Sequence, residues 1–380
     1  MKMIYLANVR IPTEKAHGVQ IMKMCQAFQK AGLDIELVVA KRSNPQFKNI
    51  SPFDYYGISQ KFPIKKLWLV DVVGWRFLGV FSVLIPNITF ALSAFFHLLF
   101  KKADIIYSRD EFSLFFLSFF KKNLVLELHT FPNSKLFLYK WLFKRIKKIV
   151  VINNRLKQVV VDLGIEPDKI LVAHDGVDLE QFIIKESKEE CRRKLNFSLD
   201  KKIVIYTGQL FKWKGVYILA EASKFLDDNF RIILVGGMKK DIVKLEEFIQ
   251  KENLGKVIIL GHQILDSIPF YLKSADVLVL PNSAKERISR EWTSPMKMFE
   301  YMASQRPIVA SDLPSLREIL NENNAILVKP DDIQDLANGI NQSLKNPDFS
   351  AKMSKQAFKN VQNYTWMKRA KKILDFLNND

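Results

Sequence analysis

The sequence predicts an α/β protein with two doubly wound, Rossmann-like domains, and three observations lead to this fold class. Short β-rich runs alternate with helical patterns almost throughout, which favours parallel sheets. The runs form two series on either side of a charged stretch at 176–202, which we interpret as a linker. The chain of 380 residues is also too long for one ordinary core. We therefore expect an N-terminal domain at 1–180 and a C-terminal domain at 181–364.

The first series begins with a strand at residues 3–9 and an amphipathic helix that ends at Gly32. Further strands are predicted at residues 34–40, 103–109, 123–129, 148–153 and 169–176. Gly18 opens the helix after a long loop, where a glycine lets the backbone approach a phosphate or a sugar closely. A plain loop explains this glycine equally well. The loop is not a G-x-G-x-x-G, so a nicotinamide cofactor is poorly supported.

The second series predicts strands at residues 202–208, 231–237, 257–261, 276–282, 307–312 and 325–330. Ligands of doubly wound folds bind beyond the carboxyl ends of parallel strands, so we look for the site there. His129 ends a strand of the first series and could hydrogen-bond a substrate, although a single histidine is more often structural. His262 lies in a loop after another strand, and this loop could cover a nucleotide base.

The stretch "YTGQLFKWKG" at residues 206–215 combines a strand, a glycine turn at Gly208 and two lysines before the next helix. Lys212 and Lys214 stand where a phosphate would lie, and Gly215 keeps the backbone open. A lysine beside a helix N-terminus stabilises charge on a departing diphosphate. A solvated basic loop is the alternative interpretation.

A sharply started helix is predicted after Ser294, with Ser294 as its N-cap and Pro295 in the first helical position. Its apolar residues share one face, and Lys297 and Glu300 lie on the opposite, non-core face. These two residues are either a solvated pair or part of a site for a ligand at the helix N-terminus.

An uncharged apolar segment spans residues 77–100. Its length alone would allow a membrane span, but Pro86 and Asn87 split it into halves that are too short to cross. We therefore rank buried domain helices first, insertion into a membrane surface second and a true span last. Lysine-rich stretches at 65–66, 101–102, 121–122 and 144–148 would attract an anionic leaflet, or form ordinary solvated faces.

The formal net charge of +18 calls for an anionic partner, which could be nucleic acid, an anionic membrane surface or a phosphate-bearing substrate. The sequence contains no known nucleic-acid module, so we give nucleic acid little weight. Two distant cysteines and five scattered histidines indicate a reducing compartment and no structural zinc. The N-terminus leads straight into a strand, so we expect no signal peptide.

Taken in order, these motifs resemble glycosyltransferase family 4, whose members are retaining enzymes of the GT-B architecture, also described as glycosyl transferases group 1. The resemblance rests on "AHGVQIMKMCQAFQKAG", "KILVAHDGVDLEQF", "TGQLFKWKG", "TSPMKMFEYMASQRPIVASDLPSLREI" and "YTWMKRAKKIL". It covers nearly the whole chain except the apolar region around 60–100. It implies two domains that face a central cleft, with a last helix at 365–380 that packs back on the N-terminal domain.

The resemblance also implies roles for particular residues. The donor diphosphate would lie on the helix N-terminus formed by Ser294, Pro295, Met296 and Lys297. Glu300 would bind the nucleotide ribose, Lys214 would contact the diphosphate, and His129 would lie near the transferred sugar. With these residues we group Gly18, Gly208, Gln209, Lys212 and His262 as donor-binding, and we regard His129 and Lys214 as catalytic.

Three positions depart from the family pattern. Trp292 stands where the family has its first acidic residue, and Glu291 is one position off. Gln209 replaces a common phosphate-binding arginine, for which Lys212 could compensate. Asp175 replaces the usual asparagine. None of these departures removes the diphosphate site, but they leave the identity of the transferred sugar open.

We expect a retaining glycosyltransferase that moves a sugar from a nucleotide-diphosphate sugar to a glycan or lipid-linked acceptor in polysaccharide or glycolipid biosynthesis. The sequence has no Asp-x-Asp motif, which fits metal independence, and we expect no cofactor. The expected location is cytoplasmic and peripheral, at the inner face of the membrane. A nucleotide-sugar epimerase of the same fold is the alternative, and a basic nucleic-acid-binding protein is a distant third.

Overall fold

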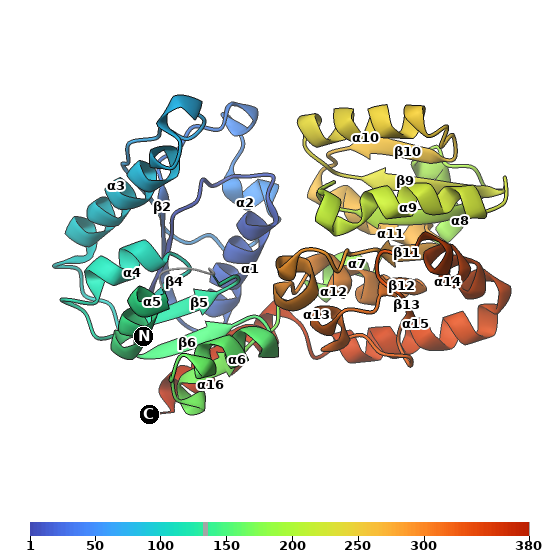
Figure 1. Ribbon diagram of the computed structural model, residues 1–380. Coiled ribbons are helices and arrows are strands. Elements are labelled where there is room, and N and C mark those ends of the chain that lie inside the picture. Colours follow the sequence, from blue (N-terminus) through green and yellow to red (C-terminus); the bar gives the residue numbers. More distant parts are fainter. Residues whose placement is uncertain (132–135, 380) are drawn as a thin grey trace. The chain divides into compact units, whose positions relative to one another are not determined.

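The computed structural model describes residues 1–131 and 136–379, which form two compact units (Figure 1). Unit 1 consists of Met1–His174 and Trp366–Asp380, and unit 2 of Asp175–Thr365. We predicted that the first domain ends at residue 180, whereas in the structure this boundary lies a few residues earlier, after His174. Each unit is built on one parallel sheet with helices on both faces. The predicted fold class is therefore confirmed.

The sheet of unit 1 has seven parallel strands in the order β3-β2-β1-β4-β5-β6-β7. The strands are β1 Lys2–Ala7, β2 Asp34–Ala40, β3 Ile64–Leu67, β4 Ile105–Ser108, β5 Leu124–Leu128, β6 Lys148–Val151 and β7 Ile170–Val172. Most are continuous runs of buried apolar residues, as expected of strands that are covered on both faces. The edge strand β3 was not predicted, because its sequence IKKL has two exposed lysines at its centre and lacks such a run.

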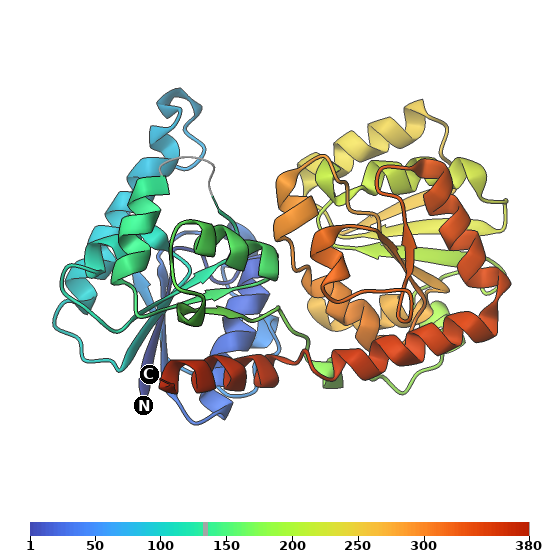
Figure 2. The same cartoon turned by 60° about the horizontal axis from the view of Figure 1, so that its bottom comes forward.

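The helices of unit 1 are α1 Ala16–Lys30, α2 Pro52–Tyr55, α3 Phe81–Leu98, α4 Glu111–Leu117, α5 Leu136–Arg145, α6 Asn154–Asp162 and the C-terminal α16 Trp366–Asn378. Helices α3 and α4 pack together on one face of the sheet (Figure 1). On the other face, α16 lies against α1, so the last segment of the chain is part of unit 1 (Figure 2).

The apolar segment differs from the prediction, because it forms one helix and not two buried halves. Pro86 lies in the second turn of α3 and does not divide it, since its missing N–H removes only one helical hydrogen bond. Only one side of α3 is buried, through Phe90, Ala91, Ala94 and Leu98. By length and composition, the segment Phe81–Leu99 is the one described helix that could cross a membrane.

The sheet of unit 2 has six parallel strands in the order β10-β9-β8-β11-β12-β13. They are β8 Lys202–Thr207, β9 Phe230–Val235, β10 Val257–Gly261, β11 Val277–Leu280, β12 Ile308–Ser311 and β13 Ile326–Val328. Its helices are α7 Leu179–Phe182, α8 Lys188–Lys194, α9 Val216–Ala222, α10 Lys239–Lys251, α11 Ile268–Ser274, α12 Met296–Ala303, α13 Pro314–Arg317, α14 Ile333–Lys345 and α15 Pro347–Val361.

Two apolar cores, one on each face, sandwich the sheet of unit 2. The first core joins α11, α12 and α15 to the sheet, and the second joins α9, α10 and α14. Side chains of the same strands alternate between them: Ile203 and Ile205 point into the first core, whereas Val204 and Tyr206 point into the second. This packing fixes the carboxyl ends of the strands.

The stretch at 176–202 is not a plain linker, which corrects the prediction. It contains α7 and α8, and α8 packs against α11 within unit 2. Arg192 of α8 is only 3% exposed and donates to the Ser274 carbonyl at 2.9 Å and to Asp276 at 2.5 Å. Asp276 also accepts from the Ile203 N–H at 2.7 Å. Most of the charge in this stretch is exposed, but this arginine joins α8 to the sheet.

Replacing Arg192 with methionine should therefore destabilise unit 2. The substitution removes the hydrogen bonds of Arg192 to Asp276 and to the Ser274 carbonyl, while Lys188 stays 3.0 Å from Asp276. A hydrogen bond to a charged group contributes about 1.5–3 kcal/mol, and we expect a loss of this size. Denaturant unfolding of Arg192→Met, with the exposed neighbour variant Arg193→Met as control, measures the loss. Equal unfolding free energies for the two variants would contradict this role of Arg192.

Candidate functional site

The candidate site of unit 2 lies where β8 ends beside α12. The Tyr301 hydroxyl of α12 accepts the Thr207 N–H at 2.8 Å, which fixes the helix against the strand. The Lys297 ammonium donates to the Thr207 carbonyl at 2.8 Å and lies 3.4 Å from the centre of the Tyr206 ring. Gly208 follows with φ +121°, and a Cβ there would stand 3.3 Å from the Lys297 nitrogen. The last residues of β8 and the turn at Gly208 thus lie against the ammonium group of Lys297.

The position of Lys297 corrects the prediction that it lies on the non-core side of its helix. The side chain is buried, because it crosses beneath the turn at Gly208 to reach the end of β8. Burial lowers the pKa of Lys297 well below its usual value, and the nearby Lys214 lowers it further. Glu300 acts in the opposite direction. Of the two alternatives for Lys297 and Glu300, the solvated pair is therefore wrong.

Lys214 approaches the same place from the loop after β8. It ends a short 3-10 turn, Lys212–Lys214, and Gly215 follows with φ +75°. A Cβ on Gly215 would stand 1.6 Å from the Pro281 carbonyl oxygen, so only glycine lets this loop pack on the end of β11. Burial lowers the pKa of Lys214 to about 7. Gly215 is therefore required for packing that positions Lys214.

Glu300 is the acidic residue that acts on Lys297. Burial raises its pKa to about 7, and the opposing effect of Lys297 is smaller. Two lysines with lowered pKa values and one glutamate with a raised pKa therefore stand together. Such a place favours a small, multiply charged anion, since an anion would restore the charged form of each lysine.

The start of α12 differs from the prediction in detail. Pro295 is the N-cap, and Met296 is the first helical residue. Ser294 makes no capping bond, because its buried hydroxyl accepts the Asp175 N–H at 3.3 Å. No side chain caps the helix, and the N–H groups of a first turn have no intrahelical acceptors. These N–H groups can bind an anion.

The remaining predicted residues of unit 2 belong to the loops after β8 and β10. The Gln209 carbonyl accepts the Tyr206 hydroxyl at 2.7 Å, and its buried Oε1 has no hydrogen-bond partner among the described residues. Lys212 is exposed beside Tyr217, and His262 is exposed in the loop after β10. Glu291 is bound to Arg287 and Arg290, at 2.9 and 3.1 Å.

Unit 1 holds the other two predicted residues. The side of Gly18 is filled by Tyr56 and Thr13, because a Cβ there would stand 2.3 Å from the Tyr56 hydroxyl. This glycine therefore permits a close internal contact, and donor binding at Gly18 stays a prediction. His129 follows β5, and its Nε2 lies 2.6 Å from Oε1 of the fully buried Glu127.

Glu127 is the residue of unit 1 that sequence reasoning missed. Its carboxylate also accepts from Gln20 at 2.8 Å, from Arg369 of α16 at 2.9 Å and from the Tyr107 hydroxyl. The pKa of Glu127 is well below its usual value, because Arg369 and the hydrogen bond from His129 outweigh the effect of burial. One charged residue inside the apolar run "NLVLELH" was the available signal.

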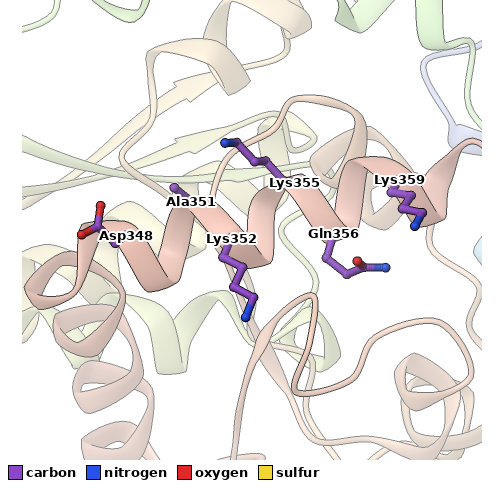
Figure 3. Close-up of a pocket in the computed structure, with 6 residues that line it drawn as sticks. All are labelled: Asp348, Ala351, Lys352, Lys355, Gln356 and Lys359. Carbon is purple, nitrogen blue, oxygen red and sulfur yellow. The ribbon is translucent and has the colours of Figure 1, made fainter.

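Neither a hollow on α15 nor the described histidine, cysteine and acidic side chains indicate a further binding site. A hollow on α15 is outlined by Asp348, Ala351, Lys352, Lys355, Gln356 and Lys359, but these come from one helix, and Lys352 and Lys355 point in different directions (Figure 3). Among the described residues, no group of three histidine, cysteine or acidic side chains is placed to hold a metal ion.

Both halves of the chain match glycosyltransferase family models. Residues 17–181 match the model of Glycosyltransferase Family 4, and residues 187–360 match that of Glycosyl transferases group 1.

Curated relatives are similar over part of their length. A putative teichuronic acid biosynthesis glycosyltransferase of Bacillus subtilis is 27% identical over 49% of this chain and 44% of its own. An N,N'-diacetylbacillosaminyl-diphospho-undecaprenol alpha-1,3-N-acetylgalactosaminyltransferase of Campylobacter jejuni is 29% identical over 60% of this chain and 59% of its own. The chain thus spans about half the length of these relatives.

Solved structures agree in fold. HepE of Anabaena in complex with UDP has a TM-score of 0.79 at 18% identity, with 100% of both chains covered. Sucrose-phosphate synthase of Thermosynechococcus elongatus has a TM-score of 0.80 at 18% identity, covering 99% of this chain and 98% of its own. At this identity the likeness supports the GT-B fold alone.

Proposed function

The two family matches place the chain among the GT-B glycosyltransferases of group 1, and on that premise we propose that it transfers a sugar from a nucleotide-diphosphate sugar to a glycan or lipid-linked acceptor. The observation that carries the proposal is the pair of desolvated lysines, Lys214 and Lys297, at the end of β8. A diphosphate supplies the negative charge that this place lacks. Its charge grows as the bond to the sugar breaks, so the lysines stabilise the leaving group.

The other residues of unit 2 have proposed roles around this diphosphate. The open N–H groups at Met296 and Lys297 receive a phosphate, and Glu300 binds the ribose. The loop at His262 covers the base, while Gly208, Gln209 and Lys212 border the phosphates. In unit 1, His129 lies near the transferred sugar. We propose that the reaction retains the anomeric configuration and needs neither a metal ion nor a cofactor, because the lysines and α12 neutralise the diphosphate.

The names of the relatives support the proposed acceptor class. One acts in teichuronic acid biosynthesis, and another is named for an acceptor linked to diphospho-undecaprenol. We therefore propose a role in cell-surface polysaccharide or glycolipid biosynthesis. These names do not favour the epimerase alternative, which predicts full conversion of the donor in the absence of an acceptor.

Replacing Lys214 with methionine should weaken the binding of nucleoside diphosphates and slow turnover further. A hydrogen bond to a charged group contributes about 1.5–3 kcal/mol, so Kd should rise roughly tenfold to a hundredfold. Turnover should fall by a further factor on the order of ten or more, since the charge on the leaving group is greatest in the transition state.

Titration calorimetry with UDP, GDP and ADP identifies the base and measures the change. Lys240→Met, an exposed lysine of α10, is the matched control and should behave like the unmodified protein. Affinity and turnover of Lys214→Met within twofold of this control would reduce Lys214 to a solvated charge.

We also propose that the protein binds peripherally to the cytoplasmic face of a membrane through an aromatic surface on unit 1. The residues that we assign to this surface are exposed apolar residues of α3 and of the segments before and after it in the chain: Phe77, Val80, Phe81, Val83, Phe96, Phe100, Phe119, Phe120 and Phe137. Phe100 is 89% exposed and Val80 81%. Lys101, Lys102, Lys121 and Lys122 stand next to these residues in the chain. Aromatic side chains beside lysines suit the interface of an anionic bilayer.

The protein should therefore sediment with vesicles that contain phosphatidylglycerol, and high salt should release it because salt screens the lysines. The double variant Phe81→Ser/Phe96→Ser should bind less, whereas Phe349→Ser, an exposed phenylalanine of unit 2, should bind normally. Equal sedimentation of all three proteins, or equal binding to neutral vesicles, would count against this surface.

A further inference from the structure

Two arginines of unit 1 lie at the carboxyl ends of neighbouring strands and have no role in the proposed function. Arg10 follows β1, and Arg42 follows β2, its parallel neighbour. The Ala40 N–H donates to the Val9 carbonyl at 3.2 Å, so the two loops are joined just before the arginines. Arg10 is close enough to lower the pKa of Arg42, although burial is the larger cause. This edge of a doubly wound sheet is where ligands bind.

The hydrogen-bonding capacity of Arg42 is incompletely used. One terminal nitrogen donates to Asn8 at 3.3 Å, and its Nε is buried with no hydrogen-bond partner among the described residues. The carboxylate of Asp71 lies 3.9 Å from Nε, and Asp110 also acts on Arg42 electrostatically. Arg10 donates to Glu14 at 2.7 Å. A guanidinium group with unused donors is suited to bind phosphate oxygens.

The same arginine is connected to the apolar helix α3. Asn8, which accepts from Arg42, donates to Asn87 of α3 at 2.9 Å. The Thr89 hydroxyl of α3 accepts the Val70 N–H at 3.1 Å, which ties the segment before α3 to the same helix. An anion bound at Arg42 would therefore lie near α3, where Val83, one helical turn before Asn87, is 60% exposed.

We propose that Arg10 and Arg42 bind the diphosphate of a prenyl-diphosphate-linked acceptor, with its hydrocarbon chain along α3. This inference rests on the proposed transfer to a lipid-linked acceptor and names the chemical class of that acceptor. Two guanidinium groups at adjacent strand ends match two linked phosphates, and the exposed apolar face of α3 matches a hydrocarbon chain. When no acceptor is bound, Glu14 holds Arg10 in place and Asp71 holds Arg42. The phosphates of the acceptor compete with these carboxylates for the arginines.

The test is titration with geranyl diphosphate, a short and water-soluble prenyl diphosphate, in the presence of a saturating nucleoside diphosphate that fills unit 2. Arg42→Gln should weaken binding at least tenfold, and Arg42→Lys should bind at an intermediate level, because the charge remains but the fork is lost. Arg155→Gln, an exposed arginine of α6, is the control and should bind within twofold of the unmodified protein. Inorganic pyrophosphate should bind more weakly, since it lacks the chain.

Several results would overturn the inference. One is equal binding by Arg42→Gln and Arg155→Gln. Another is loss of geranyl diphosphate binding in Lys214→Met but not in Arg42→Gln, which would assign the ligand to unit 2. A third is loss of phosphatidylglycerol vesicle binding by Arg42→Gln with geranyl diphosphate binding unchanged, which would make the arginines a site for phospholipid head groups.

Separate controls distinguish a failure of this inference from misfolding of the variant and from a failure of the proposed function. If Arg42→Gln melts early, Arg10→Gln replaces it, since Arg10 is more exposed, and it should also lose at least tenfold in affinity for geranyl diphosphate. Unchanged affinity in Arg10→Gln would then overturn the inference. Nucleoside diphosphate binding reports on unit 2 alone, so its absence would contradict the proposed function, whereas geranyl diphosphate binding decides this inference.

Discussion

The candidate site of unit 2 depends on one buried contact, the ammonium group of Lys297 against the Thr207 carbonyl and the Tyr206 ring. A buried ammonium group is costly unless it is compensated, and here the compensation is a carbonyl dipole and a ring face. Burial at this place lowers the pKa of Lys297, and burial of Lys214 lowers the pKa of Lys214. The fold thus holds two lysines that can take up protons where a diphosphate would bind.

Unit 1 uses the opposite charge at the corresponding edge of its sheet. Glu127 is a buried carboxylate that gathers donors from β4, α1, α16 and the end of its own strand. Because Arg369 comes from the last helix, the chain terminus and His129 are fixed to the same carboxylate. In both units one buried ionisable side chain at the carboxyl end of a parallel strand orders the polar groups around it.

Much of the fold could be predicted because parallel strands buried on both faces are continuous apolar runs, as in "KIVIYT" and "VLVL". The edge strand β3 could not, since Lys65 and Lys66 interrupt its pattern. In the candidate site, the glycines and Lys214 were predicted from their order along the chain. Helical periodicity put Lys297 on the solvent side, because no local pattern shows that a long side chain crosses beneath a neighbouring turn. The hydroxyl of Ser294 was assigned to its own helix for the same reason, although it binds Asp175.

The most direct test of this account is proton uptake when a nucleoside diphosphate binds. At about pH 8 the diphosphate is fully ionised, whereas Lys214, with its pKa near 7, is mostly neutral. Binding should raise the pKa of both lysines, so the complex should take up protons and the calorimetric heat should depend on the ionisation enthalpy of the buffer. Lys214→Met should take up fewer protons. Tight binding with a calorimetric heat that does not depend on the buffer would contradict the claim that the two lysines gain protons when the diphosphate binds.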